Sequence, residues 1–136
     1  MSRPGATAAR YVQDSVSTAS PGRLLVMLYD RLALDLVQAG DALARADRNT
    51  AHQRLLHAQR IVTELSTTLD HTAGWSGSVG LASLYAWLGS ELVRVNINGD
   101  QARLRGCIAV VEPLRDSWRA ALVSTSAVST DERLVG

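Results

Sequence analysis

The chain has 136 residues, a length that suits one ordinary domain built around a single core. Hydrophobic residues make up 46% of it and charged residues 20%, a balance that excludes an intrinsically disordered chain. The 14 basic residues, all arginine, and the 13 acidic residues are scattered and leave a net charge of +1, so there is no basic stripe for binding nucleic acid. No apolar run approaches the roughly 18 residues of a membrane span, and no signal-peptide core opens the chain. We therefore expect a cytoplasmic protein with no membrane insertion.

The start of the chain predicts a mobile segment followed by a helix. Residues 1–19 are mostly small or polar, and we expect them to be mobile. Ser20 can cap a helix, and Pro21 suits its first position because the missing N–H would have no partner there in any case. The helix is predicted over residues 21–46, with a core face of Leu25, Tyr29, Leu32, Leu36, Ala39 and Leu43.

A second and a third helix follow with the same kind of apolar spacing. The second is predicted over residues 50–70, with the bundle-like seam Ala51, Leu55, Ala58, Val62, Leu65 and Leu69, and a glycine-rich loop ends it. The third is predicted over residues 79–96, with a core face of Leu81, Leu84, Tyr85, Leu88, Leu92 and Val95. In the turn "NINGD" that follows, Gly99 can take a positive φ and Asp100 can cap the next helix.

The fourth helix is predicted over residues 101–123, with a core face of Leu104, Cys107, Ile108, Val111, Leu114, Trp118 and Ala121. Pro113 lies inside it and is expected to cause a kink near Ala109, because proline lacks the N–H that would bond to the preceding turn. Cys107, the only cysteine, has apolar neighbours and is expected to be a buried thiol. Residues 125–136 are expected to form a disordered tail.

These elements together predict an all-α fold. Four amphipathic helices with short connections pack most simply as an antiparallel up-down-up-down four-helix bundle, here over residues 20–124. No strand pattern is present in the sequence. The apolar faces are large enough to form a core without a cofactor.

The sequence contains no catalytic or metal-binding pattern that we would assign. His52 and His57 are five residues apart, whereas a metal shared on one helix favours spacings of three or four. A histidine on a four-helix bundle could accept a phosphoryl group, but His57 lacks the lysine and glycine neighbours of histidine-phosphotransfer domains. The stretch "GWSGSVG" lacks the preceding strand and following lysine of a phosphate-binding loop. We therefore expect no enzyme, no metal and no cofactor.

Several apolar side chains fall off the predicted core faces, at positions where polar residues are typical: Met27, Leu34, Leu56, Ile61, Trp87, Val93 and Ile97. Single exposed apolar residues are common on protein surfaces, and some of these side chains could pack beneath the terminal segments. Two or three lines of them on one small bundle indicate instead grooves that receive amphipathic helices of a partner. These seven residues are our candidates for partner binding.

Residues 11–30, "YVQDSVSTASPGRLLVMLYD", resemble the N-terminal signature of the FliS family of flagellar export chaperones. That signature is a tyrosine, a polar spacer, a threonine-alanine-serine-proline segment and a leucine-rich helix start that ends in leucine-tyrosine-aspartate. The later stretches "AQRIVTELSTTLD", "LASLYAWL", "VNINGD" and "LRDSW" are similar to family segments in the same order. The chain departs from the pattern at Arg31, where glycine is usual, at Trp87, which replaces a tyrosine, at Val95, which replaces an alanine, and at Pro113.

The resemblance implies a cytoplasmic chaperone for flagellin. It implies binding of the disordered C-terminal segment of flagellin, protection from premature polymerisation, and delivery to the type III export apparatus with its export gate. It also implies that residues 1–19 act as a lid over a groove, with Tyr11, Val12 and Val16 as apolar contacts. We expect a monomer or a weak homodimer. The alternatives are a four-helix adaptor for a different secreted client and a histidine-phosphotransfer domain.

Overall fold

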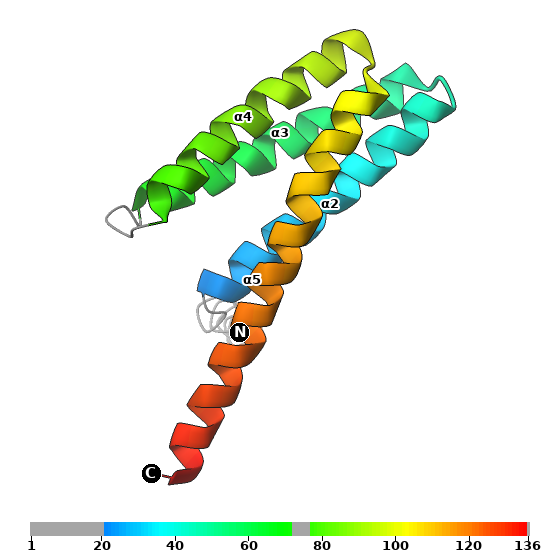
Figure 1. The fold of residues 1–136 in the computed structure, drawn as a ribbon. Helices are drawn as coiled ribbons and strands as arrows, with labels where there is room; N and C mark the ends of the chain where they lie inside the picture. The colour runs from blue at the N-terminus through cyan, green and yellow to red at the C-terminus, as the bar shows by residue number, and fades with distance from the viewer. Residues whose placement is uncertain (1–20, 72–76, 136) are drawn as a thin grey trace, which may run out of the picture.

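The computed structural model describes residues 21–71 and 77–135 and places them in four helices joined by short connections (Figure 1). These are α2 (Pro21–Ala44), α3 (Arg48–His71), α4 (Ser78–Asn98) and α5 (Gln101–Val135). Helices that follow one another in sequence run antiparallel (Figure 1). The predicted all-α antiparallel bundle and its helix order are confirmed.

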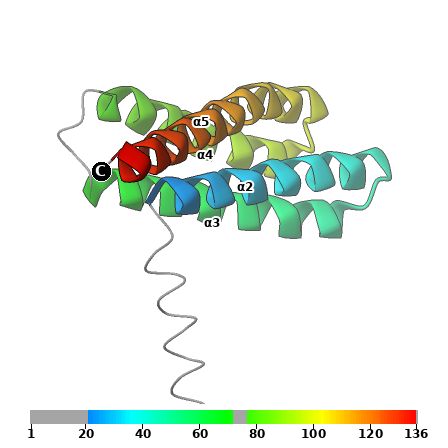
Figure 2. The same ribbon diagram turned by 90° about the horizontal axis from the view of Figure 1, so that it is seen from below.

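The four helices form two layers. α2 and α3 make one layer and α4 and α5 the other (Figure 2). Each helix packs on two others, since α2 and α4 both contact α3 and α5. α5 crosses the bundle at an angle and continues past the start of α2, where it separates from the ends of α3 and α4 (Figure 1). The helices therefore diverge at the end of the bundle near the start of α2, which we call the open end (Figure 1).

The core consists of the apolar faces that helical periodicity predicts. The six seam residues of α3 are all buried, as are Tyr29, Leu32, Leu36, Ala39 and Leu43 of α2. Cys107 is buried too, and burial raises the pKa of its thiol to about 11. Some expected core residues are only partly buried, namely Leu25, Leu81, Leu84, Ile108, Leu114 and Trp118, and Ala121 is exposed. Most of these lie toward the open end of the bundle.

The turn between α4 and α5 has the predicted geometry. Gly99 has φ of 63°, and its N–H donates to the carbonyl of Val95 at 2.7 Å. Asp100 caps α5, since its Oδ1 accepts a hydrogen bond from the Arg103 N–H at 3.0 Å. The guanidinium of Arg48, at the start of α3, donates to two carbonyls at the end of α4 and lies where a Gly99 side chain would be. Glycine is thus favoured here by the backbone conformation, and a larger residue would also have to displace the Arg48 guanidinium.

Helix ends differ from the prediction by one or two residues in α2, α3 and α4 and by twelve residues in α5. α3 begins at Arg48 rather than at residue 50, because Asp47 accepts a hydrogen bond from the Thr50 N–H at 3.1 Å and caps the helix. α5 continues through Pro113 to Val135, well beyond the predicted end at residue 123. Pro113 is exposed, and no further proline or glycine occurs before residue 136 to stop the helix. Ser20, the lid and the centre of the glycine-rich loop lie outside the described residues.

Candidate functional site

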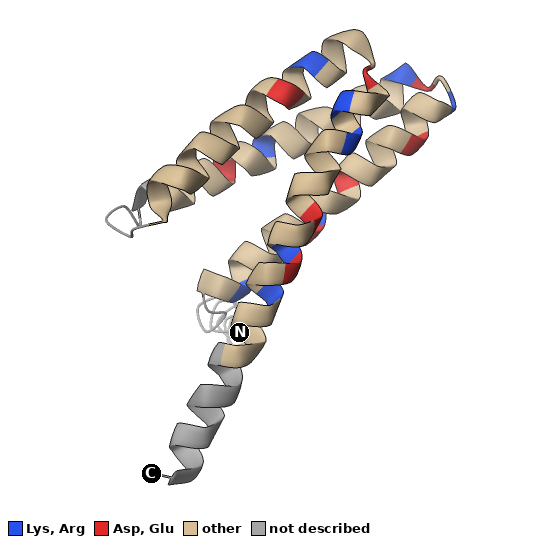
Figure 3. Ribbon diagram, in the orientation of Figure 1, with Lys and Arg blue, Asp and Glu red and all other residues tan. Residues whose placement is uncertain are grey.

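An apolar groove lies at the open end of the bundle. Its volume is about 230 Å³, and all four helices contribute to its lining: Pro21, Gly22, Leu25, Leu65, Thr68, Leu69, Leu81, Tyr85 and Trp118. Thr68, Tyr85 and Trp118 provide its only polar side-chain atoms, and none of the lining residues is charged. The first half of α4 also carries no charged residue (Figure 3). This end of the molecule can therefore accept apolar side chains with little loss of charge solvation.

Three aromatic side chains meet beneath this groove. The hydroxyls of Tyr29 and Tyr85 form a buried hydrogen bond of 2.8 Å across the bundle, from α2 to α4. The ring of Trp118, on α5, lies 6.4 Å from that of Tyr29 between centroids. Burial raises the pKa of both tyrosines, because ionisation inside the core is unfavourable. The hydroxyl pair thus stays neutral and links two helices that otherwise face each other across the core.

The same three residues come from separated stretches of the sequence. Tyr29 belongs to "VMLYD", Tyr85 to "LASLYAWL" and Trp118 to "LRDSW". Asp30 and Arg115, from the first and last of these stretches, also approach each other, with 3.9 Å between Oδ1 and Nε. Three of the motifs that carried the family resemblance therefore converge on one end of the bundle, whereas "VNINGD" forms the turn at the other end.

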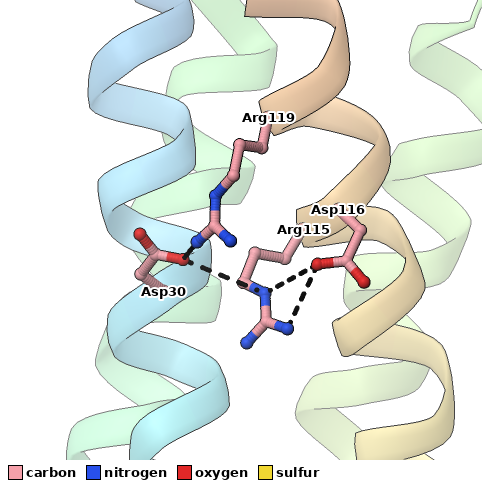
Figure 4. Close-up of polar contacts among 4 residues, drawn as sticks. All are labelled: Asp30, Arg115, Asp116 and Arg119. Carbon is pink, nitrogen blue, oxygen red and sulfur yellow. Dashed lines mark hydrogen bonds and ion pairs between the residues drawn. The ribbon is translucent and has the colours of Figure 1, made fainter.

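A charged cluster joins α2 to α5 on the outer surface beside these residues (Figure 4). Arg119 Nη2 lies 2.5 Å from Asp30 Oδ1, and Arg115 reaches toward the same oxygen. Arg115 also donates from Nε and Nη2 to Oδ1 of Asp116, at 3.2 and 3.1 Å. The second half of α5 is in this way connected to the start of α2.

The seven candidate residues do not form one continuous surface. Met27 and Leu34 are 58% and 44% exposed on the outer side of α2. Trp87 is exposed on α4, four residues before Glu91, which pairs with Arg103 of α5, so Trp87 lies on the side of α4 that faces α5.

The expectation for Ile61 was wrong. Ile61 is only 6% exposed and belongs to the core. Ile61 lies one turn after His57, whose Nδ1 pairs with Asp35 of α2, so Ile61 is on the side of α3 that faces α2. A charged substitution at this position would therefore test the stability of the fold rather than partner binding.

The remaining candidates lie along the edge between α3 and α4. His52 Nδ1 is 3.0 Å from Asn96 Oδ1, and this antiparallel register places Leu56 close to Val93. Ile97 is one turn further along α4 and is strongly exposed. A shallow groove of about 410 Å³ continues from there between the two helices, lined by Gln59, Val62, Thr63, Ser66, Thr67, Tyr85, Ala86, Gly89 and Ser90.

A buried charge that the sequence reasoning missed lies between α2 and α3. Asp35 is fully buried, and its Oδ2 pairs with Nδ1 of His57. Arg31 Nε and Arg54 Nη1 lie 3.5 and 3.6 Å from its Oδ1. The spacing of Arg31 and Asp35 by four residues is the one sequence signal that could have indicated this pairing. His57 is thus engaged by a carboxylate rather than free on the surface.

The described residues show neither a metal site nor a membrane span. No group of three or more histidine, cysteine, aspartate or glutamate side chains comes together among them. None of the helices within the described part of the chain combines the length and apolarity needed to cross a membrane. Six of the groove residues were predicted only as core, because helical periodicity does not show that the core opens at one end: Leu25, Leu65, Leu69, Leu81, Tyr85 and Trp118.

Comparisons with known proteins agree with the motifs. Residues 4–125 match the model of the family described as "Flagellar protein FliS". A "Flagellar secretion chaperone FliS" of Bacillus subtilis (strain 168) is 34% identical over 114 residues, which cover 84% of each chain. The chain belongs to the FliS family. It is therefore a flagellar export chaperone and not an enzyme.

A more distant relative agrees with the family, and a solved structure agrees with the fold. The flagellar secretion chaperone FliS of Escherichia coli (strain K12) is 25% identical over 118 residues, covering 86% of this chain and 87% of the relative. A solved "flagellar chaperone from bacteria" superposes with a TM-score of 0.72 at 20% identity and covers 89% of this chain and 98% of that one. That structure shares the FliS fold described above.

Proposed function

We propose that this FliS family member binds the C-terminal segment of flagellin in the cytoplasm, keeps it from polymerising early and delivers it to the flagellar type III export apparatus. The observation that carries the proposal is the uncharged apolar groove at the open end of the bundle, lined by residues of the family motifs. The exposed apolar residues of α2 and α4 extend the apolar surface beyond it. Such a surface suits a disordered segment that folds into amphipathic pieces as it binds.

The energetics of burial fit a chaperone that must release its client. Each methylene that leaves water contributes about 0.8 kcal/mol, so ten covered apolar side chains provide a large gross stabilisation. Ordering a disordered client offsets much of this gain. The net affinity is then moderate, and no nucleotide is needed for release.

The N-terminal segment is proposed to compete with the client for the groove. Residues 1–20 lead directly into Pro21, which is part of the groove lining. Tyr11, Val12 and Val16 are the apolar residues available for such a lid. Deleting residues 1–17 should raise the affinity for flagellin. An unchanged affinity would argue against a lid, and a much weaker one would indicate that the segment contacts the client directly.

Co-purification with flagellin tests the main proposal. We expect the chaperone to retain full-length flagellin and to lose flagellin that lacks its C-terminal helix. Equal recovery of both would contradict the proposal and would favour an adaptor for a different secreted client.

Two variants test whether the apolar groove and the exposed face of α4 bind flagellin. Thr68→Arg places a long charged side chain on an exposed position of the groove lining, and Trp87→Asp places a charge on the exposed face of α4. Both should weaken flagellin binding while circular dichroism shows unchanged helix content. Gln53→Arg is the matched control for Thr68→Arg, since it adds the same charge to an exposed position near the other end of α3. If the control weakens binding as much as the groove variant, the groove is not the site.

A further inference from the structure

The two halves of α5 are held to the bundle in different ways. Before Pro113, the helix buries Leu104, Cys107 and Val111 almost completely. After Pro113, its apolar contacts with the core come from Leu114 and Trp118, which are only partly buried. Proline also removes the backbone hydrogen bond to the carbonyl of Ala109. The helix can therefore bend most easily at this point.

Ion pairs with α2 hold the second half in place. Arg115 and Arg119 both follow Pro113, and their spacing of four residues puts them on one face of the helix. They converge on Asp30 of α2, with 2.5 Å from Arg119 Nη2 and 3.9 Å from Arg115 Nε to its Oδ1 (Figure 4). The side chains of Asp30 and Arg119 are 44% and 51% exposed. Exposed pairs of this kind are weak and are screened by salt.

The same half of α5 provides one wall of the apolar groove. Trp118, which precedes Arg119, lines the groove together with Leu65 and Leu81 and packs beside Tyr29. A small rotation of residues 114–124 about Pro113, away from α2, would carry the indole away from Tyr29. The groove would then become wider and Trp118 more accessible to solvent.

We propose that Asp30, Arg115 and Arg119 form an electrostatic latch that holds the second half of α5 against α2 and keeps the apolar groove narrow, with Pro113 as the hinge. An exposed ion pair shifts the equilibrium between the closed and the open position of this half of α5 by only about 1.5- to 5-fold. The latch therefore opens readily when a bulky apolar segment enters the groove. That consequence for the client rests on the proposed function, whereas the opening itself is a property of the free protein.

Fluorescence quenching in the free protein tests the latch. Trp75→Phe and Trp87→Phe leave Trp118 as the only tryptophan of the full chain. We expect Asp30→Asn to raise the acrylamide quenching constant of Trp118 by up to about fivefold at low salt. High salt should raise the quenching of the chain with Asp30 intact toward the same value, because the Debye length falls from about 30 Å at 0.01 M to about 3 Å at 1 M. Equal quenching with and without Asp30 at both salt concentrations would overturn the latch.

Control variants separate the latch from general effects of charge. Asp41→Asn removes one negative charge from an exposed position further along α2, the same change of charge as Asp30→Asn, and it should leave Trp118 quenching unchanged. Pro113→Ala restores the missing hydrogen bond and should reduce the response to salt. A response to Asp41→Asn as large as that to Asp30→Asn would show that net charge, not the latch, controls Trp118.

Flagellin affinity then decides whether the latch gates the client. Asp30→Asn should raise this affinity at low salt, because the latch no longer keeps the groove narrow. The variant should also abolish the difference in affinity between low and high salt that the latch causes. If quenching rises but affinity does not respond, the latch does not gate the groove and that part of the proposal fails. If flagellin is not bound by the unaltered protein, the proposed function fails, and the quenching experiment still decides the latch.

Discussion

Removing one hydroxyl of the buried tyrosine pair should destabilise the protein more than its size suggests. Tyr29 and Tyr85 are 0% and 2% exposed, and their hydroxyl oxygens lie 2.8 Å apart. In Tyr85→Phe, the Tyr29 hydroxyl stays buried and loses this partner, while its hydrogen bond with the Trp118 side chain remains. Loss of a hydrogen-bond partner by a buried polar group costs about 1–3 kcal/mol. We therefore expect the free energy of unfolding to fall by about that amount, and the melting temperature by roughly 3–6 °C for each kcal/mol.

Urea unfolding followed by circular dichroism measures the effect in a double-mutant cycle. Tyr29→Phe, Tyr85→Phe and the double variant are compared, with Tyr11→Phe, outside the described residues, as the control for a lost hydroxyl elsewhere. The double variant leaves neither tyrosine hydroxyl unpaired, so it should cost less than the sum of the two single variants. Costs that simply add, or single variants within about 0.5 kcal/mol of the unaltered protein, would refute this reasoning.

Four further predictions concern the rest of the bundle. His57→Ala should lower the free energy of unfolding in urea by about 1.5–3 kcal/mol, because the buried Asp35 carboxylate loses a hydrogen bond. His52→Ala, on the exposed side of α3, should change it by less than about 0.5 kcal/mol. Equal effects of the two variants would contradict the role of Asp35. By the same measurement, Gly99→Ala should cost about 1–2 kcal/mol, since Gly99 has a positive φ and Arg48 fills the space beside it. Gly89→Ala should stabilise α4, because an added side chain meets no other atom there. A neutral Gly99→Ala would show that the turn tolerates other residues. Hydrogen bonds from Thr50 hold the pKa of Asp47 below its ordinary value. The contribution of Asp47 to stability is therefore present above its unfolded-state pKa and is lost as pH falls through its folded-state pKa. Asp47→Asn should reduce the loss of stability at acidic pH, and an unchanged loss would argue against the cap. With a thiol pKa of about 11 and a buried position, Cys107 should react with a thiol reagent at neutral pH only as fast as the protein unfolds, and rapid labelling of the folded protein would contradict its burial.

The helices and most of the core could be predicted from sequence because both depend on local spacing. The seam of α3, from Ala51 to Leu69, repeats at intervals of three and four, and every residue of it is buried. The turn at Gly99 could also be predicted from the sequence, since a positive φ favours glycine and aspartate is a strong N-cap residue at position 100. The ends of helices depend on weaker signals, and so α5 extends further than the sequence indicated.

The surface was harder to predict because exposure depends on where neighbouring helices lie. Met27 and Ile61 both fall off the predicted core faces, yet Met27 is exposed and Ile61 is buried against α2. Aspartate is usually found on protein surfaces, yet Asp35 is fully buried. Arg31, Arg54 and His57 approach its carboxylate from two helices. No spacing within one helix shows the approach of Arg54 and His57 from α3.

The sequence by itself determined the fold class, the helix order and, through motifs spread over the chain, the membership of the FliS family. These follow from local periodicity and from residue identities, which are present in the chain before it folds. Only the tertiary structure decided that Tyr29, Tyr85 and Trp118 meet under one apolar groove and that Asp30 joins Arg115 and Arg119 beside it. The physical reason is the crossing of α5, which packs along α2 and separates from α3 and α4 at one end, so that residues far apart in sequence become neighbours and part of the core opens to solvent.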